Sequence, residues 1–300
     1  MAVPYSRYLI GSLPWYSVLV VAGMAAAIAL CMKEERRLGL PKDTALDLAL
    51  WVIPVGVLGA RIYYVVFTWE HFSANPLSVF AVWQGGLAIY GGIIAGFLTV
   101  VIFALCRHLS TAMLTDMVVP GVALAQAIGR WGNYFNQEAY GGVIENTALQ
   151  FFPAGVLIAE NGTLVWHQAT FFYESAWNLL VFVLLWTGRR KRARPGDTTL
   201  WYLLLYSAGR VLIEGLRTDS LMAGSLRISQ VLSAVMLAAV PLFFILRLEQ
   251  KKALQAELCL AAMNLALWWL MWCQASVLLC ALSCLGILLL TLYAERKSRQ

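Results

Sequence analysis

Seven apolar runs, each long enough to cross a bilayer, constrain the fold of this chain more than any other feature. They lie near residues 14–32, 45–67, 87–106, 113–129, 169–187, 198–216 and 227–246. A membrane-spanning helix needs roughly 17–25 predominantly apolar residues. A soluble domain could not bury the apolar surface of a chain that is 61% hydrophobic and 13% charged. The sequence therefore predicts an all-α polytopic membrane protein with a seven-span core.

A further apolar stretch runs from about 258 to 293. It is too long for one helix, which rises ~1.5 Å per residue across ~30 Å of hydrocarbon. Asn264, Gln274 and Ser276 interrupt it, and both of its flanks are basic. We therefore expect two short helices in a C-terminal apolar hairpin. The predicted division is a core over residues 1–250 and a hairpin extension over 251–300.

Basic residues alternate between the two ends of the predicted spans. Most of the lysines and arginines lie on every second boundary, for example at 33–42, 189–194 and 296–299. Because cytoplasmic loops of membrane proteins carry an excess of Lys and Arg, this side is expected to be cytoplasmic. The N-terminus is then outside and the C-terminus cytoplasmic. The formal charge of +6 follows this topology and does not indicate binding to nucleic acid.

The longest outer loop lies between the fourth and fifth predicted spans. Within it, residues 155–166 place Asn161-Gly162 between two short apolar runs. That pattern is typical of a tight β-hairpin turn. We predict a small outer β-hairpin cap, within an outer head at about residues 131–168.

Polar and charged side chains interrupt two of the apolar regions. The segment GRWGNYFNQEAYGG (129–142) carries Arg130, Asn133, Asn136 and Glu138 directly after an apolar run. A later run holds Arg210 and Glu214 four residues apart, hence on one helical face. The same face continues with Tyr206 and Arg217. A charged group at membrane depth is costly, so it usually has a partner or a function.

The balance of these charges points to an anionic ligand. Arg130, Arg210 and Arg217 against Glu138 and Glu214 leave about one uncompensated positive charge. Guanidinium is a planar fork of donors that suits phosphate, so we expect a site for the headgroup of an anionic lipid. This interpretation requires that the guanidinium groups are not sealed in mutual pairs and that the site opens sideways toward the bilayer.

The residues alone leave three alternatives to this interpretation open. Arg210 and Glu214 could be a structural pair that neutralises itself inside the bundle. A transporter or channel for an anionic solute could also place arginines at membrane depth, although no internal repeat is visible. A further alternative is a lipid-headgroup enzyme with a different acceptor.

The few histidines and cysteines form no metal-ligand pattern, so no metal or cofactor is expected.

Seven segments, in order, resemble the prolipoprotein diacylglyceryl transferases of bacterial membranes. The resemblance covers roughly residues 14–246, and its most specific part is GRWGNYFNQEAYG, which we call the signature segment (129–141). The other segments are Trp15-Tyr16, ARIYYV around Arg61, VWQGGLAIYGG at 82–92, ATFFYE ending at Glu174, YSAGRVLIEGLR at 206–217 and ISQVLS at 228–233.

The resemblance implies an enzyme of the bacterial plasma membrane. It would transfer the diacylglyceryl group of phosphatidylglycerol to the lipobox cysteine of a prolipoprotein signal peptide, form a thioether and release glycerol 1-phosphate. The resemblance places Arg130 and Arg210 at functional positions of the family, and we expect these catalytic guanidinium groups to stabilise the leaving phosphate. It implies a substrate-binding role for Tyr16, Arg61, Asn133, Asn136, Glu138, Gly141, Tyr206, Glu214 and Arg217.

Tyr90 is the clear departure from the family pattern. Many members have histidine there, in a His-Gly-Gly motif that could supply a catalytic base, whereas this chain reads Tyr90-Gly91-Gly92. Either the tyrosine takes over this catalytic role, or the position never supplied an obligatory base. Because a phenol with a pKa near 10 is a poor base at neutral pH, we favour the second interpretation. Glu138 or Glu214 could accept the thiol proton or orient the arginines, and we favour orientation.

Overall fold

The computed structural model describes residues 6–73, 75–192, 194–218, 222–223, 226–248, 250–273 and 276–298. Gln274 and Arg299, which the sequence singled out, lie outside these residues. The contacts between residues divide the chain into two compact units. The first comprises residues 1–25, 122–193 and 197–300, and the second comprises residues 26–121 and 194–196. Each unit is described by itself.

A long helix covers every predicted span. These helices are α1 (Trp15–Leu38), α2 (Thr44–Phe67), α4 (Ile89–Cys106), α5 (Thr111–Asn136), α6 (Thr170–Gly188), α7 (Asp197–Glu214) and α8 (Ile228–Ile245). In the described part of the chain, eight helices are long and apolar enough to cross a membrane. The prediction of a polytopic α-helical membrane protein is confirmed. The sixth predicted span, α7, is not one of the eight; it carries Asp197, Arg210 and Glu214.

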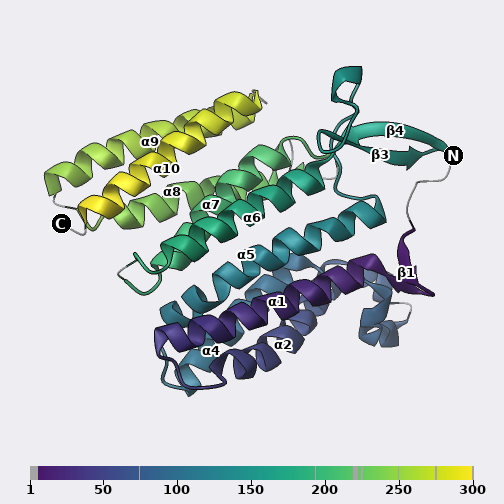
Figure 1. Cartoon of the computed structure of the whole chain (residues 1–300), viewed down its shortest axis with the longest axis horizontal. Coiled ribbons are helices and arrows are strands. Elements are labelled where there is room, and N and C mark those ends of the chain that lie inside the picture. Colours follow the sequence, from purple (N-terminus) through teal and green to yellow (C-terminus); the bar gives the residue numbers. More distant parts are fainter. Residues whose placement is uncertain are drawn as a thin grey trace. The chain divides into compact units, whose positions relative to one another are not determined.

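The C-terminal hairpin is confirmed as two helices, α9 (Gln250–Trp272) and α10 (Val277–Lys297). Both pack on α8, as the light green and yellow ribbons of Figure 1 show. At 23 and 21 residues they are longer than the short helices that we expected, because polar residues extend each helix past its apolar part. Leu267 and Ile287 are fully buried in a core that also includes α6, α7 and α8. The predicted domain boundary at residue 250 stays a prediction.

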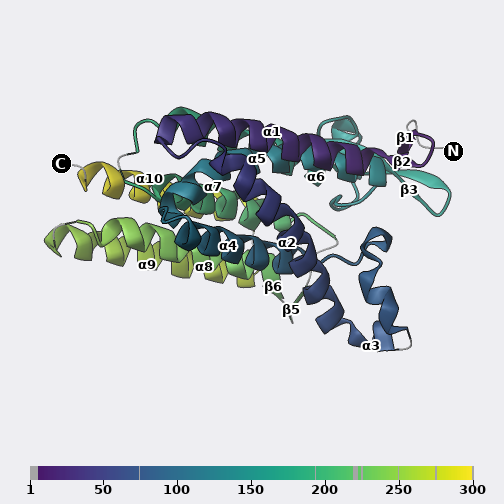
Figure 2. The same ribbon diagram turned by 90° about the horizontal axis from the view of Figure 1, so that it is seen from below.

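In the second unit, α2 lies along α4 with their backbones in contact. A Cβ added to Gly91 would lie 2.4 Å from the carbonyl oxygen of Gly59, so only glycine permits this approach. These glycines therefore allow the two helices to pack closely. Between the two helices the chain forms α3 (Trp69–Ser73), η1 (Pro76–Phe80) and η2 (Val82–Gln84). This segment lies around the label α3 at the lower right of Figure 2.

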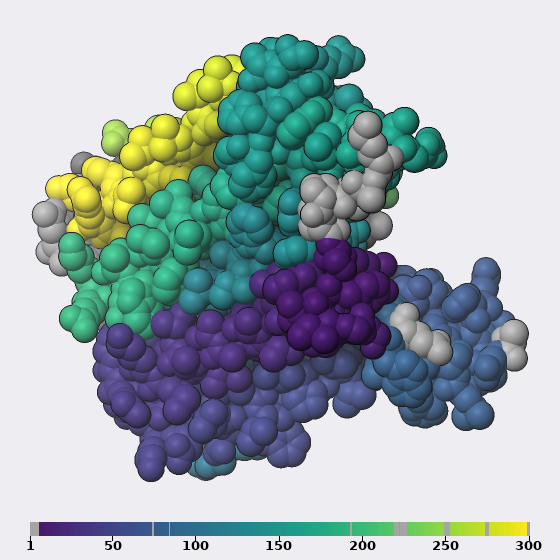
Figure 3. Space-filling view, turned by 45° about the vertical axis from the view of Figure 1, so that its right-hand side comes forward, coloured from purple at the N-terminus to yellow at the C-terminus, as the bar shows by residue number. Residues whose placement is uncertain are grey.

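In the first unit, the predicted hairpin is present as β3 (Gly155–Glu160) and β4 (Thr163–Gln168), which pair in antiparallel register. Asn161 and Gly162 have φ angles of 49° and 82°, as a type I′ turn requires. Val156 and Ile158 bury their side chains with Phe171 of α6. The residues between α5 and α6 form a continuous teal surface in Figure 3.

Three short elements of the first unit were not predicted. They are the ribbon of β1 (Tyr8–Ile10) and β2 (Leu13–Pro14), the ribbon of β5 (Met222–Ala223) and β6 (Leu226–Arg227), and the 3-10 helix η3 (Thr147–Leu149). Strands of two or three residues are too short to produce a recognisable alternation of apolar and polar positions.

Candidate active site

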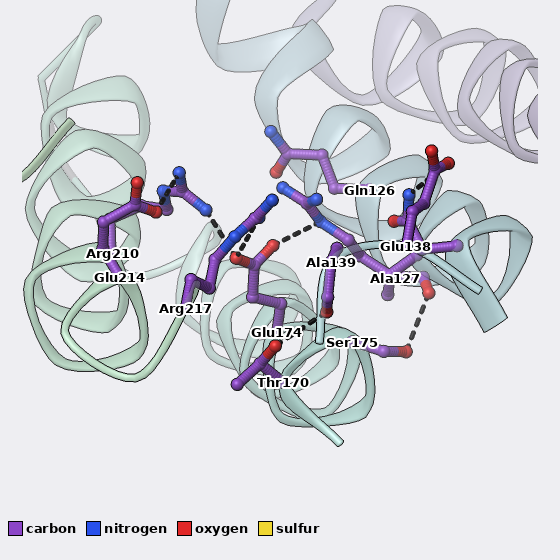
Figure 4. Close-up of polar contacts among 12 residues, drawn as sticks. Gln126, Ala127, Glu138, Ala139, Thr170, Glu174, Ser175, Arg210, Glu214 and Arg217 are labelled. Atoms are coloured by element: carbon purple, nitrogen blue, oxygen red, sulfur yellow. Dashed lines mark hydrogen bonds and ion pairs between the residues drawn. The ribbon is translucent and has the colours of Figure 1, made fainter. Parts of the chain in front are cut away.

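Glu174 is the centre of a cluster of three arginines in the first unit. Its carboxylate, 3% exposed, lies 2.5 Å from Nε of Arg130 on α5 and 2.5 Å from Nη1 of Arg210 on α7. Nη1 of Arg217, just past the end of α7, lies 3.1 Å away. Figure 4 shows the carboxylate of Glu174 directed toward Arg210 and Arg217. We call Arg130, Arg210 and Arg217 the arginine cluster.

A second carboxylate completes the charge balance of the arginine cluster. Nη2 of Arg210 lies 2.5 Å from Glu214, as the spacing of four residues predicted. Ser229, at the start of α8, donates a hydrogen bond of 2.6 Å to the same carboxylate. Three guanidinium groups and two carboxylates leave one net positive charge in a largely buried site. The surplus of one positive charge is as large as inferred from the sequence, but its members differ from those expected, because Glu174 takes the place of Glu138.

The arginines are paired, yet they are not sealed from their surroundings. Their side chains are 23%, 15% and 13% exposed for Arg130, Arg210 and Arg217. A small cleft of about 10 Å³, room for about one water molecule, lies beside Arg210. Its lining includes Glu174, Trp177, Asn178, Tyr206, Gly209 and Arg210. This cleft has no room for a phosphate group, so an opening of the site toward the bilayer stays a prediction.

Glu138 lies apart from the arginine cluster, on the turn that follows α5. It is exposed, and its Oε1 accepts hydrogen bonds from Nδ2 of Asn133 at 2.9 Å and of Asn136 at 3.1 Å. The expectation that Glu138 balances the arginines is therefore wrong in this structure. The reason is geometric: α5 ends at Asn136, so Glu138 is on the turn, while Arg130 is on the helix itself.

Gly141 connects the signature segment to the arginine cluster. It forms an isolated antiparallel bridge with Arg217. A Cβ at Gly141 would lie 2.7 Å from the carbonyl oxygen of Leu216 and 2.8 Å from Oε1 of Gln168, so only glycine fits. Its own carbonyl oxygen lies 2.9 Å from Nδ1 of the buried His167.

Arg61 belongs to the second unit, and its donors are occupied by backbone carbonyl groups. Nε donates to Val79 at 2.8 Å, Nη1 to Gly85 at 2.8 Å and Nη2 to Ser78 at 2.7 Å. The side chain is buried. In this structure Arg61 organises the chain between α3 and α4.

The three predicted tyrosines occupy different surroundings. Tyr206 lines the cleft and stacks on Tyr202 with ring centroids 5.7 Å apart. Tyr16, on α1, is 40% exposed and packs over Gly132 of the signature segment. Tyr90 is half-buried near the start of α4, in the second unit.

Of the sequence-predicted residues, the structure brings Arg130, Arg210, Glu214 and Arg217 into one network, with Tyr206 beside it. Glu174 was missed as a site residue. Its signal was visible, because a carboxylate within an apolar run needs a cationic partner. Ser229 carried no comparable signal, since a serine near a helix start commonly caps the helix.

Comparisons with known proteins agree with these observations. The family model described as prolipoprotein diacylglyceryl transferase matches residues 7–246. The phosphatidylglycerol–prolipoprotein diacylglyceryl transferase of Limosilactobacillus reuteri is 41% identical over 237 residues, 78% of this chain and 86% of its own length. The protein of the same name from Streptococcus pneumoniae is 44% identical over 241 residues, 80% of this chain and 91% of its own length.

Proposed function

The chain belongs to the prolipoprotein diacylglyceryl transferase family, and from this membership we propose the reaction in full. It transfers the diacylglyceryl group of phosphatidylglycerol to the thiol of the lipobox cysteine in a prolipoprotein signal peptide. The products are a thioether-linked lipid and glycerol 1-phosphate. No cofactor enters this scheme.

The observation that carries the assignment of the site is the convergence of three guanidinium groups on one buried carboxylate. The net positive charge of the arginine cluster would be balanced by the phosphate of the lipid. Arg130 meets Glu174 through Nε, and its Nη atoms make no hydrogen bond with the described residues. These donors can therefore bind a phosphate oxygen without breaking the ion pair.

The reaction displaces a phosphate ester at a saturated carbon. The cysteine sulfur forms a bond to the glyceride carbon that carries the phosphate, and the carbon–oxygen bond breaks. Its electron pair leaves with the oxygen of glycerol 1-phosphate, and the thiol proton goes to a carboxylate. Negative charge therefore grows on the phosphate, where preorganised donors in a water-poor site stabilise the transition state. The same positive field favours the thiolate.

Glu174 and Glu214 orient the arginines in this scheme. Glu174 accepts hydrogen bonds from Arg210 and Arg217, while Glu214 forms an ion pair with Arg210 and accepts a hydrogen bond from Ser229. Asn133 and Asn136 hold Glu138 at the edge of the site, where the three polar groups would meet the glycerol headgroup or the peptide backbone. Tyr16, Tyr206 and Gly141 would shape the surroundings of the substrates. For Arg61, whose donors are occupied by backbone carbonyl groups, we keep only the role of organising the segment between α3 and α4.

Arg210→Lys tests the role of the guanidinium fork. Arg210 contacts two different carboxylates through two nitrogens, and a lysine keeps the charge but has a single nitrogen. Purified protein is incubated in detergent with phosphatidylglycerol and a synthetic lipobox peptide, and the thioether product is measured by mass. We expect the rate to fall by about 10²–10³-fold, as for the loss of one donor in an oxyanion site.

The matched control is Arg107→Lys. Arg107 is also ion-paired, with Asp47 at 2.7 Å, but it lies in the second unit outside the arginine cluster. Its rate should stay at the wild-type level. Near-normal transfer by Arg210→Lys would contradict the proposed phosphate site. Anion flux in liposomes without any thioether product would instead favour a transporter.

The orientation in the membrane follows from the charge of the loops. We propose that the N-terminus lies outside and the C-terminus in the cytoplasm, since basic residues gather on alternate boundaries. This arrangement puts the hairpin of β3 and β4 on the outer face, where secreted substrates arrive. Reporter domains fused to each terminus test this topology; a C-terminal reporter that is active only outside the cell would contradict it.

A further inference from the structure

The turn after α5 is held in a backbone conformation that its sequence does not favour. Gln137 and Ala139 have φ angles of 53° and 57°, in the left-handed region that non-glycine residues rarely occupy. Such conformations persist only where surrounding contacts fix them, and they occur often at functional sites. We call residues 137–139 the signature turn, since Glu138 lies between the two strained residues.

Two contacts from outside the turn hold these residues. The backbone N–H of Ala159, in β3, donates to Oε1 of Gln137 at 2.9 Å. The hydroxyl group of Thr170, the first residue of α6, donates to the carbonyl oxygen of Ala139 at 2.7 Å. Thr170 is fully buried, and Ala139 is 4% exposed. Water therefore cannot readily replace this second hydrogen bond.

Thr170 uses its hydroxyl group in an unusual way for its position. Ser and Thr at helix starts commonly cap the first backbone N–H groups, but the N-cap of α6 is Ala169, which makes no side-chain cap bond. The hydroxyl group of Thr170 reaches the signature turn instead. Thr170 and Glu174 are four residues apart, so they share one face of α6, as Figure 4 shows.

We propose that Thr170 is a positioning residue that fixes the signature turn relative to the arginine cluster. One turn of α6 then holds both parts of the site: Glu174 orients the three arginines, while Thr170 fixes the backbone that presents Glu138. This inference rests on the proposed function, because it assumes that Glu138 contributes to transfer. Thr170 itself touches no reacting atom in this scheme.

Thr170→Val removes the hydroxyl group and keeps the shape of the side chain. We expect the rate of the lipobox-peptide reaction to fall about tenfold, the rate equivalent of one lost buried hydrogen bond. Thr170→Ser keeps the donor and should restore the rate to within about threefold of wild type. A Thr170→Ser variant as slow as Thr170→Val would assign the effect to packing and overturn the proposal.

Ser175→Ala is the matched control. Ser175 lies on the same helix and donates a buried hydrogen bond of 2.8 Å to the carbonyl oxygen of Ala127, away from the signature turn. Its loss should lower the unfolding temperature as much as Thr170→Val does, without the loss of rate. Equal slowing of both variants would show that any lost hydrogen bond on α6 has this effect, and would overturn the proposal.

A double-mutant cycle with Glu138→Gln tests whether Thr170 acts through Glu138. If it does, the double variant is no slower than Glu138→Gln alone, because coupled effects are not additive. Rate losses that multiply would overturn the proposal. A fully active Glu138→Gln would refute the assumed contribution of Glu138, and with it this part of the proposed function. A slow Glu138→Gln with an unaffected Thr170→Val would refute only the role of Thr170.

Discussion

Glu174→Gln is the most informative single change in the arginine cluster, because its carboxylate neutralises positive charge that would otherwise attract the phosphate. It lies 2.5, 2.5 and 3.1 Å from nitrogens of Arg130, Arg210 and Arg217. Glutamine has nearly the same shape and keeps one oxygen acceptor, but it removes the charge. The net charge of the cluster then rises from one to two. We expect slower transfer together with tighter binding of an anion.

The size of this effect follows from the geometry. Two unit charges about 4 Å apart interact by about 4 kcal/mol at an effective dielectric constant near 20. The side chains of the arginine cluster are 13–23% exposed, and Glu214 still neutralises part of Arg210. We therefore expect the binding free energy of a phosphate to become more favourable in Glu174→Gln by only about a third of this energy. That fraction corresponds to a roughly tenfold lower Kd.

The assay is the shift in thermal unfolding of the detergent-solubilised protein on addition of glycerol 1-phosphate. A ligand that binds only the folded state raises its stability in proportion to the logarithm of ligand concentration over Kd. Without ligand, Glu174→Gln should unfold at a lower temperature than wild type, because an unpaired buried charge is costly. With ligand, its temperature shift should exceed that of wild type.

Asp47→Asn is the control for this experiment. It also removes a carboxylate paired with an arginine, but in the second unit, so its response to glycerol 1-phosphate should match that of wild type. If glycerol 1-phosphate stabilised Glu174→Gln no more than wild type, the arginine cluster would not be the phosphate site. The reasoning from charge balance would then be refuted.

Three further changes have defined outcomes. Gly141→Ala introduces a Cβ 2.7 Å from the carbonyl oxygen of Leu216. We expect overpacking to lower the stability by about 1–3 kcal/mol, measured by thermal unfolding, and to slow transfer in the peptide assay. Arg61→Ala removes the donors to Val79, Gly85 and Ser78, so limited proteolysis should cut within residues 75–88 faster than in wild type, and unchanged cleavage would contradict this role. Tyr90→Phe should keep near-wild-type transfer, whereas a large loss would make the phenol part of the chemistry.

The spans and the hairpin turn could be predicted because they depend on local pattern. Run length and hydropathy are enough to identify a spanning helix, and Asn161-Gly162 encodes its own turn geometry. The ion pair between Arg210 and Glu214 was also predictable, since both residues lie on one helix. Helix ends were less predictable: α1 continues to Leu38 through a basic segment, because cations are favourable near a helix C-terminus.

The partners of the buried charges could not be predicted from spacing. Glu174 meets its arginines across three helices, and spacing along the chain describes contacts only within one helix. The same limit applies to Arg61. Arginine in an apolar run indicates that an electronegative partner exists, but backbone carbonyls, carboxylates and a lipid phosphate all satisfy it. The partners of Arg61 are backbone carbonyl groups. Every residue has one, so the types of side chain along the sequence do not reveal them.

Backbone contact at Gly59 and Gly91 locks α2 and α4 against rotation. If either helix rolled about its axis, side chains would enter a space in which even a single Cβ does not fit. The two helices therefore form one rigid pair. The segment from α3 to η2 follows α2 and leads into α4, so both of its ends are attached to this pair. Arg61, on α2, holds the segment through hydrogen bonds to its backbone carbonyl groups. For this segment to move away from α2, Arg61 must first release the carbonyl groups. The movement would then be a change of backbone torsions within the segment, because the two helices stay together.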